Sequence, residues 1–171
     1  MSYEFYVPFF HVPGRYEWCT IHAEQYGSFD CFIVIHTTTD RPVTVYVSAE
    51  SGARFMRERF PESTAVRVSP AALQIEAHDT RSARGRVTAE EGPVRSAEME
   101  FVARADALPV ATHYGDRSFA VWGSRFWCEG VDMELPAGVT GRVVGADGSE
   151  ERFENADGIL TVGSYGELQE L

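Results

Sequence analysis

Hydrophobic and polar residues alternate along several short segments of the chain, a period of two that is typical of strands with one buried face. The clearest case lies between residues 82 and 104, where apolar positions alternate with polar ones on both sides of a loop at 91–93. The apolar set is Ala83, Gly85, Val87, Ala89, Ala97, Met99, Phe101 and Ala103. The pattern predicts a hairpin that pairs Arg86 with Glu98 and Arg84 with Glu100 on its outer face, so these charges need no catalytic explanation.

Further strands are predicted from β-branched runs and from the turn residues between them. The runs FIVIHTTT and VTVYVSA flank a turn at 39–42 and predict a hairpin in which His36 falls opposite Tyr46. Residues 147–148 and 155–158 are expected turns of a C-terminal meander, which a short tail at 164–171 follows. One helix is expected, with Ser51 as its N-cap and Pro61 as its stop.

The N-terminal segment is dense in aromatic residues and is interrupted by Pro8 and by Pro13. These prolines indicate an edge strand, a turn and a second strand, and residues 1–15 are expected to cover an apolar opening. About ten strands with short turns and one helix predict an all-β, mainly antiparallel fold. We expect one domain over residues 1–171, built as a single β-barrel or strongly curved sheet.

The stretch FAVWGSRFWCEGVDMEL, residues 119–135, fits one long bent strand in either of two registers. In the first register the odd positions face inward, which encloses Arg125 and Glu129 on either side of Trp127. In the second, a bulge at 129–130 shifts the phase and a different set faces inward: Trp122, Ser124, Phe126 and Cys128. The second register is favoured, because arginine and glutamate are almost never fully buried unless they are paired.

The acidic composition argues against two classes of binding partner. A formal net charge of -11 argues against nucleic acid and anionic membranes, because both require a basic surface. No apolar run reaches the roughly 18 residues of a membrane helix, and the N-terminus lacks the basic start of a secretory signal, so a cytoplasmic location is expected. The three cysteines, Cys19, Cys31 and Cys128, form no CxxC pair and predict free, mostly buried thiols.

The sequence carries no catalytic, metal or cofactor motif. It has no glycine-rich phosphate loop, no GxSxG and no HExxH, and its five histidines lack the spacing of metal ligands. No metal and no cofactor are therefore predicted.

An aromatic-lined cavity that binds a small apolar or aromatic metabolite is the leading functional expectation. Its predicted lining is Trp122, Ser124, Phe126, Trp127, Cys128, Met99, Phe101 and Trp18. In general architecture alone, such a protein is similar to lipocalin-like barrels and to the small barrel cyclases of natural-product pathways. A cofactor-free cyclase or isomerase would polarise a substrate carbonyl, and the candidates for that role are Arg125, Glu129, His36 and Tyr46.

Three alternatives stay open at this point, and one of them is metal-dependent chemistry with Cys19 and His22 as candidate ligands. A passive carrier would need only the cavity and no catalytic group. A non-catalytic structural or interaction protein would instead oligomerise through exposed aromatics such as those of FYVPFF, and a homodimer is compatible with that pattern.

Overall fold

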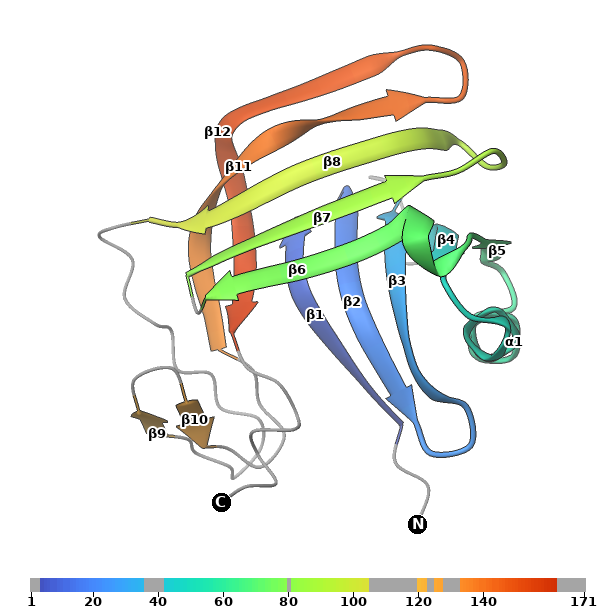
Figure 1. The fold of residues 1–171 in the computed structure, drawn as a ribbon, viewed down its shortest axis with the longest axis horizontal. Coiled ribbons are helices and arrows are strands. Elements are labelled where there is room, and N and C mark those ends of the chain that lie inside the picture. The colour runs from blue at the N-terminus through green and yellow to red at the C-terminus, as the bar shows by residue number, and fades with distance from the viewer. Residues whose placement is uncertain are drawn as a thin grey trace.

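The computed structural model describes residues 4–35, 42–79, 81–104, 120–122, 125–127 and 133–162. Ten strands of this part form one curled, mixed sheet in the order β5-β4-β3-β2-β1-β12-β11-β8-β7-β6, which has the shape of a half-barrel (Figure 1). The predicted all-β fold with one short helix is confirmed. The elements are β1 (Glu4–Val12), β2 (Tyr16–Ala23), β3 (Gly27–Ile35), β4 (Pro42–Val47), α1 (Glu50–Arg59), β5 (Thr64–Arg67), the 3-10 turn η1 (Pro70–Ala72), β6 (Leu73–Asp79), β7 (Ser82–Thr88), β8 (Val94–Ala103), β9 (Ala120–Trp122), β10 (Arg125–Trp127), β11 (Met133–Gly145) and β12 (Glu150–Val162).

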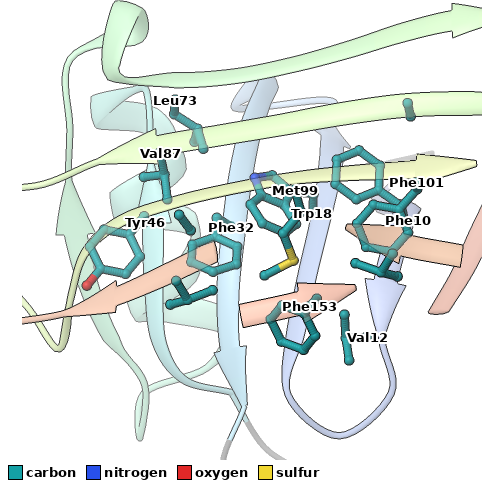
Figure 2. Close-up of a cluster of buried hydrophobic side chains, with 14 of the residues drawn as sticks. Phe10, Val12, Trp18, Phe32, Tyr46, Leu73, Val87, Met99, Phe101 and Phe153 are labelled. Atoms are coloured by element: carbon teal, nitrogen blue, oxygen red, sulfur yellow. The ribbon is translucent and has the colours of Figure 1, made fainter. Parts of the chain in front are cut away.

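The inner face of the curled sheet encloses the larger of two hydrophobic clusters, to which strands from both halves of the sheet contribute (Figure 2). The Trp18 ring stacks on Phe32 at a centroid distance of 4.2 Å and lies 5.0 Å from Phe10. Phe10 in turn lies 4.5 Å from Phe101. These rings are fully buried, so the inner face of the described strands is a packed core.

The outer face of β2, β3 and β4 carries the second cluster, which α1 covers. Successive side chains of a strand point to opposite faces, so alternate residues of the same three strands contribute to one cluster and to the other. Phe55 and Met56 of α1 pack here, and the helix is the crossover between the parallel strands β4 and β5. None of the helices in the described ranges is long and apolar enough to cross a membrane.

The N-terminal strand departs from its predicted edge position. β1 pairs with β2 along most of its length and with β12 at Phe10 and His11, so it lies inside the sheet order. Pro8 is accommodated because the register with β2 shifts between Pro8 and Phe10, where a strand tolerates a residue without an N–H donor.

Two predicted registers were tested by the strand pairing. The hairpin of β7 and β8 is confirmed, with Arg86 opposite Glu98 and Arg84 opposite Glu100. The pairing of His36 with Tyr46 was wrong, because Tyr46 lies opposite Phe32. Tyr46 therefore pairs four positions earlier on β3 than a turn at residues 39–42 implies.

The long strand predicted over residues 119–135 was also wrong. β9 and β10 pair with each other as a two-stranded antiparallel sheet, with Arg125 opposite Trp122, and β11 begins only at Met133. The segment therefore contributes two short antiparallel strands and the start of β11, where one continuous strand was expected.

Residues 155–158, predicted as a turn, lie within β12. A bulge there places one extra residue in β12, between the pairs Val139–Ala156 and Gly141–Phe153, and the strand continues. Asn155 takes the left-handed φ of 48°, a conformation that asparagine tolerates better than most residues. The turn at 147–148 is confirmed, with Gly148 at φ 84°. The helix begins two residues earlier than predicted, with Ala49 as its N-cap and Ser51 inside it.

Candidate functional site

Four residues of the predicted site lie on the inner face, and the structure brings them into one cluster: Trp18, Tyr46, Met99 and Phe101. All four are fully buried among other side chains of the core. The Tyr46 hydroxyl accepts a hydrogen bond from the Val94 N–H at 2.8 Å and donates one to the Val94 carbonyl at 3.0 Å. Because these bonds tie β4 to the start of β8, the geometry gives Tyr46 a structural role.

The other predicted site residues are not placed by the structure in enough detail to compare. His36, Ser124, Cys128 and Glu129 lie outside the described residues. For Trp122, Arg125, Phe126 and Trp127 only the backbone of β9 and β10 is described. Their predicted roles remain predictions.

A different group of polar residues gathers on the outer face of β11, β12, β1 and β2. His11 of β1 lies directly opposite Glu17 of β2 and opposite Ile159 of β12. Thr161 follows Ile159 on the same face and lies opposite Glu134 of β11. We call His11, Glu17, Glu134 and Thr161 the outer polar cluster.

Burial perturbs the two titratable groups at the centre of this cluster in opposite directions. Desolvation raises the pKa of the Glu17 carboxyl to about 7, because the charged form is poorly solvated there. Desolvation also lowers the pKa of His11, and the negative charge of Glu134 partly offsets that effect. The neutral imidazole of His11 on β1 therefore faces the Glu17 carboxyl on the adjacent strand β2, and this carboxyl titrates near neutral pH.

Within the part of the chain that the structure describes, two buried polar atoms of the cluster have no hydrogen-bond partner, His11 Nδ1 and Thr161 Oγ1. The Thr161 side chain is 3% exposed, so water does not reach it freely. Leaving a buried polar group unpaired costs about 1–3 kcal/mol, which makes such groups uncommon. A bound molecule with a carbonyl or hydroxyl group would supply the missing partner.

The outer face also carries a groove of about 410 Å³ over β7, β8, β11 and β12. Charges of both signs line it: Arg84, Glu98, Glu100, Arg142, Arg152 and Glu154. Arg84 and Glu100 form the ion pair expected from the sequence. Since the charges alternate in sign and are exposed, the groove favours no single class of ligand.

The outer polar cluster was missed at the level of sequence, although one signal for it was present. A turn at Pro13–Gly14 pairs Val12 with Tyr16 and therefore His11 with Glu17. The contribution of β12 could not be found in this way, because Thr161 reaches β1 through a pairing distant in sequence.

Comparison with protein-family models, with curated proteins and with solved structures finds no match to this chain. Within the described ranges, no three histidine, cysteine, aspartate or glutamate residues are arranged to hold a metal ion.

Proposed function

We propose that the protein binds a small, largely apolar molecule bearing a carbonyl group and moves a proton within it, as a cofactor-independent isomerase. The observation that carries the proposal is the outer polar cluster, in which a carboxyl with a pKa near 7 faces a neutral histidine beside unpaired buried polar atoms. Perturbed titratable groups of this kind concentrate at functional sites.

The chemistry follows from the separate properties of three side chains. Ionised Glu17 removes a proton from the carbon next to the carbonyl, and its pKa near 7 suits it to give and take protons at neutral pH. His11 Nδ1–H and the Thr161 hydroxyl donate to the oxygen that becomes negative. Protonated Glu17 then returns the proton at another carbon, so the net change is an isomerisation without oxidation or reduction.

The apolar part of the ligand would contact the hydrophobic residues beside the cluster. Ile159, which is half-buried, lies opposite His11 on β12. The inner aromatic cluster has less support as the binding cavity, because its described rings contact one another. The oligomerisation alternative gains no support from Phe10, which is fully buried, or from Phe9, which packs against the core.

Proton exchange at carbon tests the proposal without a known substrate. The protein is incubated in D₂O with a panel of small cyclic β,γ-unsaturated ketones, and loss of the proton next to the carbonyl is followed by NMR. We expect catalysed exchange whose rate rises as the pH increases through about 7, because the ionised form of Glu17 is the base.

Glu17→Gln should reduce the exchange rate at least about 100-fold, the usual contribution of a general base. The matched control is Glu154→Gln, because Glu154 is exposed on β12 away from the cluster, and its rate should equal that of the wild type. Equal rates for Glu17→Gln and the control would contradict the proposed role of Glu17.

A further inference from the structure

Cys19 and Cys31 face each other across β2 and β3, two positions along β2 from Glu17. They are directly opposed partners in the antiparallel pairing, and their Sγ atoms lie 2.7 Å apart. Both side chains are fully buried in the outer hydrophobic cluster to which α1 contributes, and both thiols are free. The sequence predicts free thiols, and the structure adds that two of them are in contact.

The backbone at this position matches the span of a disulfide. Directly opposed residues of an antiparallel pair have Cα atoms about 4.5–5.5 Å apart. A disulfide spans Cα atoms about 4.4–6.8 Å apart. The two sulfur atoms can therefore bond through changes in side-chain torsion, with no movement of one strand relative to the other.

The surroundings of the pair control how fast it can react. Burial raises the pKa of the Cys19 thiol well above its ordinary value, and the neighbouring Cys31, Glu17 and Asp30 raise it further. Thiolate is the reactive form, so the folded pair reacts slowly. An oxidant gains access when α1 or the hairpin of β2 and β3 opens locally.

We propose that Cys19 and Cys31 form a reversible intramolecular disulfide, with a small disulfide such as oxidised glutathione as the oxidant. One cysteine thiolate attacks a glutathione sulfur and displaces one glutathione, which leaves a mixed disulfide on the protein. The second cysteine attacks the protein sulfur of that bond and displaces the other glutathione. Two electrons pass from the protein thiols to glutathione disulfide, and the two thiol protons go to the released glutathione thiolates.

The bond would crosslink β2 to β3 on the face that α1 covers. It closes a loop between positions 12 apart in the chain, and such crosslinks stabilise a fold mainly by restricting its unfolded state. This proposal is independent of the proposed function, since it needs neither a ligand nor Glu17.

The test uses the full chain with Cys128→Ser, which leaves only these two thiols. The protein is incubated with oxidised glutathione, and the reaction is quenched with acid. The protein is then unfolded and alkylated with iodoacetamide, and its mass is measured by mass spectrometry. We expect a product that has lost two hydrogen atoms and takes up no alkyl group, with one peptide linking Cys19 to Cys31. Its melting midpoint should exceed that of the reduced form by about 5 °C or more, and dithiothreitol should reverse both changes.

Two additions make the test decisive. Adding Cys31→Ser to this variant leaves a single thiol, which should yield only the glutathione adduct or a crosslinked dimer. A parallel incubation in urea below the unfolding transition should accelerate disulfide formation, because opening of α1 exposes the thiols. Uptake of two alkyl groups after prolonged incubation both with and without urea would overturn the proposal.

Discussion

The two faces of β1 and β2 differ sharply beside the turn that joins these strands, although the residues that form them are neighbours in the chain. Inward, Phe10 and Trp18 pack ring against ring in a core that reaches across the half-barrel. Outward, His11 and Glu17 face each other with perturbed pKa values, and His11 Nδ1 has no hydrogen-bond partner among the described residues. The two hydrophobic clusters supply stability, which allows this part of the outer face to hold poorly solvated polar groups.

Removing a ring from the inner face should have the largest effect on stability. Phe32 is fully buried and stacks on Trp18, so Phe32→Ala leaves a cavity among rigid neighbours. We expect the free energy of unfolding to fall by about 3–5 kcal/mol, measured by urea denaturation at constant pH. A loss below about 1 kcal/mol would instead fit a ring that lines an open ligand cavity.

The local parts of the fold were predictable because short-range patterns decide them. The hairpin of β7 and β8 has strict alternation and a short loop, and its charge pairs were predicted correctly. Residues 155–158 have the composition of a turn, yet β11 pairs with β12 through this region and the extra residue becomes a bulge. Long-range pairing overrides local turn preference there, and a single sequence contains no measure of that pairing.

The candidate site was likewise predictable only where its residues are close in sequence. His11 and Glu17 are joined by a short turn and could have been paired from the sequence alone. Thr161 and Glu134 join them only because β12 lies beside β1 in the sheet order. The stretch 119–135 misled the prediction because its apolar alternation is that of one continuous strand, whereas β9 and β10 pair with each other.

The poorly solvated Glu17 carboxyl on the outer face should make the stability of the protein depend on pH. The pKa of Glu17 is raised from 4.5 to about 7 in the folded protein, so the folded state keeps a proton that the unfolded state releases. Stability should therefore fall as the pH rises from about 4.5 to about 7, by up to about 3 kcal/mol. Glu17→Gln should remove this loss and be more stable than the wild type at pH 8, as measured by urea denaturation across the pH range.

The His11 imidazole changes the pH dependence of stability in the opposite direction, so its effect must be measured separately from that of Glu17. Its pKa is lowered, so the unfolded state takes up a proton first and stability falls as the pH drops below about 6.5. The difference between Glu17→Gln and the wild type isolates the carboxyl, and Glu154→Gln serves as the exposed control. Parallel pH profiles for Glu17→Gln and the wild type would mean that the Glu17 carboxyl is well solvated.

The smallest expected effect comes from exchanging a single hydroxyl for a methyl group. Making this exchange on each face compares the two faces directly. Thr161→Val removes an unpaired buried hydroxyl from the outer face, so the free energy of unfolding should stay equal or rise by up to about 1 kcal/mol. The reciprocal change, Val139→Thr, places an unpaired hydroxyl in the inner core and should cost about 1–3 kcal/mol. If Thr161→Val instead destabilised the protein by as much as Val139→Thr, the hydroxyl would have a partner within the fold. It would then not be available to a ligand.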